Sequence, residues 1–218
     1  MSSYWYYLSY WVHGPESSGG LQSPYAKYCQ VVDAPGTVGS GAYLLFEFPM
    51  AFWLEQQGYD VIYCSNLDLH LDPDILKMPK VYLSVGHDEY WSRKMFEETL
   101  KARDEGLSLA FLSGDTMWYE IYGYESLVTA APFRTFARKQ DFGGEEQKLM
   151  GVKSGPNGYG DWVVTKPEHW IYEGLGLKAG DRIPARVSGM GGTFGVDPLV
   201  QGITANALNR MIRDSPRR

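Results

Sequence analysis

The sequence predicts an α/β fold in which a mainly parallel sheet is flanked by helices. The clearest evidence is the segment 80–105, KVYLSVGHDEYWSRKMFEETLKARDE, which reads as an apolar strand, a turn at Gly86 and then a helix. Ser92 is placed to cap that helix. Strand and helix patterns also alternate along the first half of the chain, and this alternation builds parallel sheets through right-handed crossovers.

The elements follow one another in a regular order. A helix beginning at Pro49 carries an apolar stripe of Met50, Trp53 and Leu54, and it ends at Gly58. Further helices are predicted at Asp74–Lys77 and Arg93–Glu105. The predicted strands are Lys27–Val32, Tyr59–Cys64, Val81–Val85 and Leu107–Leu112, and Trp162–Thr165 is a weaker candidate.

We interpret residues 1–218 as a single domain, a size that is sufficient to bury a core. Residues 1–24 form an irregular, aromatic-rich N-terminal segment, and residues 120–218 form a less regular C-terminal part. The N-terminal aromatic residues either lie across the core as an amphipathic strand or helix, or form an exposed platform for a ligand.

Composition excludes several classes of partner. The net charge is −6 and there is no cluster of Lys and Arg outside the last residues, which argues against nucleic acid and anionic membrane surfaces. No stretch approaches the roughly 20 apolar residues of a membrane-spanning helix. No secretory signal is visible, and two cysteines, Cys29 and Cys64, cannot form a disulfide framework. We therefore expect a soluble, cytoplasmic protein.

Polar side chains follow each of the four strands. Asp33, Ser65 with Asn66, the run His87 to Tyr90, and Ser113 with Asp115 would meet at one edge if the strands are parallel. Ligands of open α/β sheets bind at that edge. The sequence therefore places the candidate site there.

The run after the third strand allows three interpretations. His87 and Glu89 can act as a general acid–base pair, share a metal ion with further ligands, or belong to a structural hydrogen-bond network. No serine or cysteine follows Gly86, so a nucleophile elbow is not indicated. Asp115 either caps the next segment or faces His87.

Two stretches resemble a known family. FPMAFWLEQQGYDVIYCSNLDLH (48–70) and VYLSVGHDEYWSRKMFEETLKARDEGLSLAFLSGD (81–115) are similar to the C-terminal, glutamine-amidotransferase-like domain of the large (beta) subunit of N,N-dimethylformamidase. The similarity is continuous from Tyr43 to Tyr119. It implies a Rossmann-like sheet of the class I glutamine amidotransferase type.

The resemblance also implies a chemistry, the hydrolysis of a small substituted formamide at a mononuclear iron held by two tyrosines and a glutamate. By position, Glu89 resembles the glutamate ligand and His87 its neighbour in the pocket. Tyr25 resembles one tyrosine ligand, and Lys139 resembles a pocket lysine.

This chain also departs from the family pattern. Ala34-Pro35-Gly36 stands where relatives have R-P-Y, so the second tyrosine ligand is missing from that position. Tyr90, Asp115 or Tyr28 would have to replace it. Asp115 itself stands where an asparagine is usual.

Two functions follow as hypotheses. In the first, the chain hydrolyses the C–N bond of a small amide, with Glu89 binding a metal ion or water, His87 moving protons, and Asp115 orienting the substrate beside Lys139. In the second, it is a catalytically inactive amidotransferase-like domain that binds a small molecule or a partner protein. A second copy or a second subunit could complete the pocket in either case.

Overall fold

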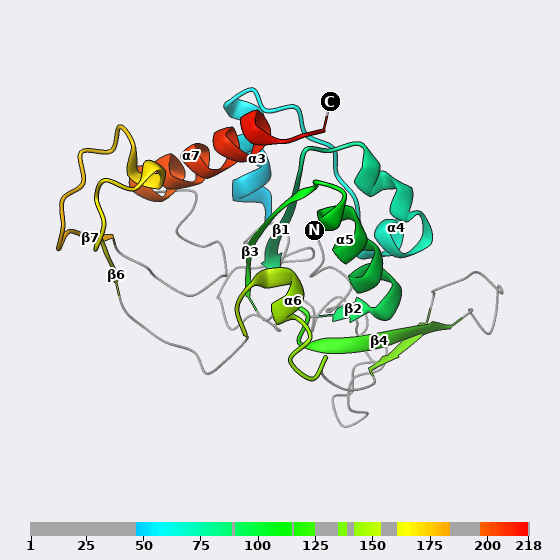
Figure 1. Cartoon of the computed structure of the whole chain (residues 1–218). Helices are drawn as coiled ribbons and strands as arrows, with labels where there is room; N and C mark the ends of the chain where they lie inside the picture. The colour runs from blue at the N-terminus through cyan, green and yellow to red at the C-terminus, as the bar shows by residue number, and fades with distance from the viewer. Residues whose placement is uncertain are drawn as a thin grey trace, which may run out of the picture.

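The structure, a computed structural model, describes residues 47–88, 90–114, 116–124, 135–138, 142–153, 161–183 and 197–217. Within these ranges helices cover both faces of a parallel strand pair (Figure 1), which confirms the predicted α/β class.

The centre of the fold is the strand pair β1 (Val81–His87) and β3 (Ser108–Gly114). The two strands run parallel, with Val81 opposite Ser108 and His87 opposite Gly114. The predicted strands at these positions and their parallel direction are thus confirmed. Their carboxyl ends meet at one edge, as the sequence indicates.

Helices on one face of this pair build the larger core. Helix α5 (Arg93–Asp104), which is capped by Ser92 as predicted, packs with α4 (Asn66–Leu71) and the 3₁₀ helix η4 (Pro73–Lys77). Tyr82 of β1 and Leu109 and Phe111 of β3 face this core. Its buried members are Leu69, Leu76, Trp91, Met95, Phe96, Ala102, Leu107, Met117, Phe142 and Leu149.

The opposite face carries helices from distant parts of the sequence. Helix α3 (Phe48–Gln56) and helix α7 (Pro198–Asp214) lie together on this side of β1 (Figure 1). Their core consists of Met50, Trp53, Leu54, Val85 and Leu208, with Val81 and Leu83 packed against it. Alternate residues of β1 therefore point into different cores, which explains why its sequence is apolar on both faces.

Helix α7 is not among the elements predicted from the sequence. It begins at a cap in which the Asp197 side chain accepts hydrogen bonds from the backbone N–H groups of Leu199 and Val200. Asn206 donates to the carbonyl groups of Ile171 and Glu173, which ties α7 to the segment containing η5 (Trp170–Tyr172). This segment and α7 form one packed unit.

The remaining strands form two further sheets. Strand β2 (Tyr90–Ser92) pairs parallel with β4 (Tyr119–Tyr124), which pairs antiparallel with β5 (Thr135–Arg138). Strand β6 (Trp162–Val163), at the predicted position, pairs antiparallel with β7 (Arg182–Ile183). The short helix α6 (Gln147–Met150) precedes β6 in the sequence. The described sheets are therefore mixed, where the sequence predicts a mainly parallel sheet.

One predicted strand is wrong. Residues 59–65 have no regular secondary structure, although they carry the β-rich sequence YDVIYCS. Ile62 is 52% exposed and Tyr63 44% exposed, whereas a strand inside a parallel sheet has both faces covered. The predicted strand Lys27–Val32 and the aromatic segment 1–24 lie outside the described residues.

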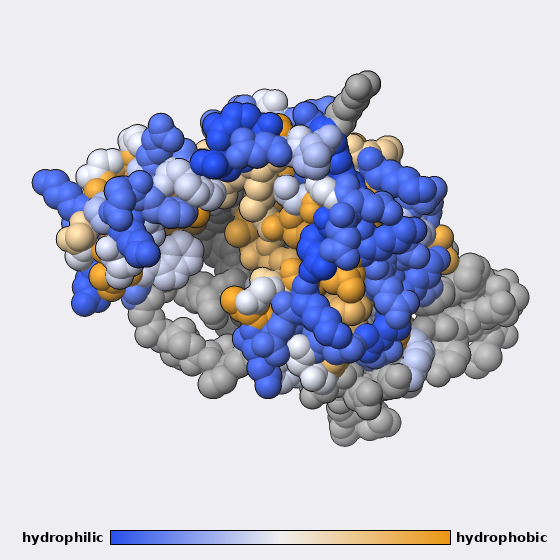
Figure 2. Space-filling model, viewed as in Figure 1, coloured by the Kyte–Doolittle hydropathy of each residue, from blue (hydrophilic) through white to orange (hydrophobic). Residues whose placement is uncertain are grey.

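The surface is mostly hydrophilic on the outer side of α5. In the view of Figure 2, apolar side chains gather in a hollow over β3, between α5 and α7, and every residue of β3 is half-buried. Among the described helices none is both long and apolar enough to span a membrane.

The C-terminal tail is held by one arginine. The Arg217 guanidinium donates to the backbone carbonyl of Ala102 at 2.8 Å and to that of Leu76. These carbonyl groups belong to α5 and η4, so Arg217 connects the end of α7 to the opposite helical layer.

We predict that Arg217→Gln lowers the free energy of unfolding by about 1–3 kcal/mol, because half-buried carbonyl groups lose a charged donor. Urea unfolding followed by tryptophan fluorescence would measure this. Arg213→Gln is the matched control, because Arg213 makes an exposed ion pair with Asp214. The control should change stability by less than about 0.5 kcal/mol, and equal losses in both variants would contradict the prediction.

Candidate functional site

For two strands, β1 and β3, the structure confirms that the carboxyl ends meet at one edge of the sheet. His87 ends β1 opposite Gly114, the last residue of β3. Asp88 follows directly, and Ser113 and Thr116 lie beside it through a chain of hydrogen bonds. The carboxyl ends of β1 and β3 therefore share one polar cluster, as the sequence predicts.

At the centre of the cluster lies the Asp88 carboxylate, which is 1% exposed. Its Oδ1 accepts from the Trp91 indole N–H at 2.7 Å and from the Asn66 amide at 3.2 Å. Its Oδ2 accepts from the Ser84 hydroxyl at 2.6 Å. Three donors from three segments thus compensate for the cost of removing this group from water.

A row of hydroxyl groups continues from Asp88 to the end of β3. Ser84 Oγ lies 2.8 Å from Ser113 Oγ, which lies 2.5 Å from Thr116 Oγ1. Because Ser84 gives its hydrogen to Asp88, it must accept from Ser113, and Ser113 in turn must accept from Thr116. The carboxylate therefore sets the direction of every hydrogen bond in the row.

The backbone of Asp88 is fixed as well. Its N–H donates to the Gly114 carbonyl at 3.2 Å, and its carbonyl accepts from the Met117 N–H at 2.9 Å. Met117 has a φ of +56°, a left-handed conformation that costs a non-glycine residue about 1 kcal/mol. Its side chain is 1% exposed, and burial in the core offsets this cost.

The structure describes only part of the predicted site. The side chain of His87 and the whole of Glu89, Asp115, Lys139 and Tyr25 lie outside the described residues. The positions on either side of Glu89 and Asp115 are described, and they belong to the Asp88 cluster or adjoin it. In the described part of the chain, no three His, Cys, Asp or Glu side chains come together as a metal site.

Tyr90, a predicted metal ligand, lies in β2 and is 8% exposed. Its ring stacks on Tyr119 with centroids 5.6 Å apart, and it packs against Ile121. Its backbone carbonyl accepts from the Asn66 amide at 3.1 Å, the same amide that binds Asp88. The ring and the backbone of Tyr90 are therefore both held beside the cluster.

An ion-pair network joins the start of α5 to β4. Arg93, the first residue of α5, bonds Glu120 of β4 at 2.8 Å and also bonds Glu145. Its guanidinium lies over the rings of Phe96 and Phe142. The Glu120 hydrogen bond is the largest cause of the raised pKa of Arg93, and the Arg93 hydrogen bond is the largest cause of the lowered pKa of Glu145.

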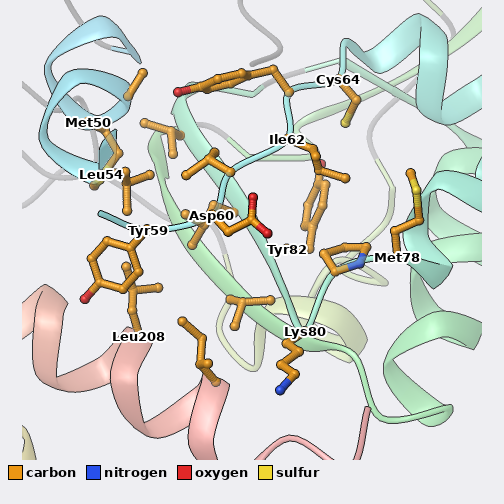
Figure 3. A pocket seen from close by; sticks show the side chains of 18 of the residues that line it. Met50, Leu54, Tyr59, Asp60, Ile62, Cys64, Met78, Lys80, Tyr82 and Leu208 are labelled. Atoms are coloured by element: carbon orange, nitrogen blue, oxygen red, sulfur yellow. The ribbon is translucent and has the colours of Figure 1, made fainter. Parts of the chain in front are cut away.

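A cavity of about 650 Å³ lies along β1 (Figure 3). It is partly open to solvent and is lined by α3, residues 58–64, η4 and the residues that follow it, β1 and α7, and most of its wall is apolar. Asn66 lines the cavity and also donates to Asp88, so the cavity reaches the polar cluster. Burial, with a smaller effect of the Asp88 charge, raises the pKa of the Tyr82 hydroxyl on its wall well above the usual value.

A family model described as "N,N-dimethylformamidase beta subunit-like, C-terminal" matches residues 3–197. The chain belongs to this family. The match confirms the resemblance seen in the sequence and extends it on both sides. It includes every predicted site residue and stops just before α7. A search of curated proteins finds no match to the chain.

Sequence reasoning missed the role of Asp88 in this member of the family. Four polar residues in a row, His87 to Tyr90, give no indication of which one points inward. Asn66 and Ser84, its partners, are far from it in sequence or hidden inside an apolar strand. A polar serine at position 84, in a strand otherwise buried on both faces, is the one local signal of an internal partner.

A second buried contact joins α4 to α5. Ser92 Oγ accepts from the Met95 N–H at 3.2 Å and lies 2.7 Å from His70 Nδ1, so a hydrogen bond links the cap of α5 to α4. Burial, with a smaller contribution from Lys94, lowers the pKa of His70 below 6.5.

We predict that stability declines as the pH falls below about 6.5, because the unfolded chain then takes up a proton at His70 before the folded chain does. The contribution of His70 to the free energy of unfolding is fully present above that pH, and it is lost as the pH falls toward the lower pKa of the folded state. Urea midpoints at about pH 7.5 and about pH 5.5 should differ less in His70→Gln than in the wild type. An unchanged difference would show that His70 is not responsible.

Proposed function

We propose that the chain is a hydrolase that cleaves the C–N amide bond of a small formamide at the carboxyl edge of β1 and β3. Membership in the N,N-dimethylformamidase beta subunit-like family carries this proposal. The matched range includes His87, Glu89, Asp115 and Lys139. The polar cluster at the end of β1 and β3 supports the location, because ligands of α/β sheets bind at this edge.

The reaction requires two tasks of the protein. A water molecule must be delivered to the carbonyl carbon, and a proton must reach the departing nitrogen. In this proposal Glu89 binds the water or a metal ion, and His87 moves protons between water and nitrogen. Asp115 and Lys139 orient the substrate amide.

The donor types proposed for this site would suit a mononuclear iron. Glu89, Tyr25 and Tyr90 offer carboxylate and phenol oxygens, which are hard donors suited to ferric iron. Bound there, iron would supply Lewis acidity toward the amide carbonyl. The Tyr90 ring stacks on Tyr119, and its backbone carbonyl accepts a hydrogen bond from Asn66. Its hydroxyl would therefore have to bind the iron without a movement of the backbone.

We also propose a glutamine-amidotransferase-like, Rossmann-type arrangement. The parallel pair β1 and β3 between two helical layers supports it. The "beta subunit-like" description supports a second subunit as partner.

The test is hydrolysis of N,N-dimethylformamide and other small formamides, measured as release of amine, with iron content determined on the same sample. We predict that Glu89→Gln and His87→Asn each lower kcat/KM by about 100-fold or more, as expected when a general acid–base group or ligand is removed. Glu105→Gln is the control, because Glu105 is an exposed carboxylate near the opposite edge of the sheet. Wild-type rates in Glu89→Gln would contradict the assigned site. An iron-loaded wild type that hydrolyses no formamide would favour the second hypothesis, a catalytically inactive domain that binds a small molecule or a partner protein.

A further inference from the structure

Segments that are distant in the sequence converge on Asp88. Asn66 comes from the first turn of α4, Ser84 from the interior of β1, and Trp91 from β2. Gly114 at the end of β3 and Met117 in the turn after it both bond the Asp88 backbone. One residue therefore connects four elements at the edge where the reaction is proposed.

Asp88 is not placed to touch a substrate. Its carboxylate is 1% exposed, and both of its oxygens accept hydrogen bonds from the protein. Such a group can influence a reaction only through the residues that it holds.

Two candidate positions lie between anchored neighbours. Residue 89 is flanked by Asp88 and by Tyr90, whose carbonyl accepts from Asn66. Residue 115 is flanked by Gly114, whose carbonyl accepts from Asp88, and by Thr116, whose hydroxyl begins the row leading to Asp88. The Asp88 network therefore constrains the backbone on both sides of each position.

We propose that Asp88 is the positioning residue of this site, holding residues 88 and 90 and residues 113, 114, 116 and 117 in one arrangement through its carboxylate and the hydroxyl row of Ser84, Ser113 and Thr116. Its catalytic meaning rests on the proposed function. Because the acceptor-only carboxylate orients all three hydroxyl groups, its loss removes the order of the whole row, whereas loss of the Thr116 hydroxyl removes the bond that ties residue 116 to Ser113.

The experiment uses two independent changes. Asp88→Ala removes the acceptor, and Thr116→Val removes only the far hydroxyl while keeping the shape of the side chain. Thr116→Ser retains the hydroxyl and should restore wild-type behaviour. Leu208→Ala serves as a control for lost stability, because Leu208 is buried in the core on the other face of β1.

Formamide kinetics and hydrogen exchange are measured on each variant. We expect Asp88→Ala and Thr116→Val to lower kcat at least about tenfold with KM changed less than about threefold, and Leu208→Ala to leave kcat within about twofold. Exchange of the Met117 amide should accelerate at least about tenfold in Thr116→Val and not in Thr116→Ser.

The possible failures can be told apart. Wild-type kcat and exchange in Thr116→Val would overturn the positioning role, and so would equal kcat losses in Leu208→Ala and Thr116→Val. If the wild type hydrolyses no formamide, the proposed function fails. The exchange of Met117 in the two Thr116 variants then decides alone whether the row holds the segment. The comparison of Thr116→Val with Thr116→Ser also keeps the test decisive if Asp88→Ala does not fold.

Discussion

The burial of one carboxylate determines the geometry of the polar edge of this fold. An unpaired carboxylate in a protein interior costs several kcal/mol, so Asp88 is tolerated only where donors surround it. Those donors come from the start of α4, the middle of β1 and the indole of Trp91. The same indole packs in the larger hydrophobic core, so the polar cluster and the apolar core are built from shared residues. Neither can shift without the other.

Much of the fold could be predicted from local sequence signals. The apolar run of β1 and the Ser92 cap of α5 are short-range features, and both elements appear where the sequence places them. Tyr59–Cys64 has the same β-rich composition, but composition does not reveal whether a segment is covered on both faces, and this one leaves Ile62 and Tyr63 exposed. Helix α7 was missed although its sequence carries a signal, because apolar residues from Leu199 to Ile212 recur at spacings of three and four behind Asp197 and Pro198.

The location of the candidate site could be predicted better than its internal order. The parallel direction of β1 and β3 follows from the alternation of elements, and it brings His87 opposite Gly114. Asp88 points inward because its carboxylate accepts hydrogen bonds from three residues. These are Ser84, four positions earlier, Trp91, three positions later, and Asn66 in helix α4. These partners meet only in three dimensions. The proposed chemistry rests on family membership, because neither composition nor strand order contains it.

Helix α7 shows that the folded core of this protein extends beyond the residues that the family model matches. The family match ends at residue 197, yet the helix that follows contributes Leu208 to the core beneath β1, and Asn209 and Ile212 to the cavity wall. Tyr59 also donates its hydroxyl hydrogen bond to Asn209. A fragment ending at residue 197 would expose the part of this core that α7 covers, with only α3 among the described helices left over that side of β1. Any recombinant fragment or transplanted form of this domain therefore needs the complete helix.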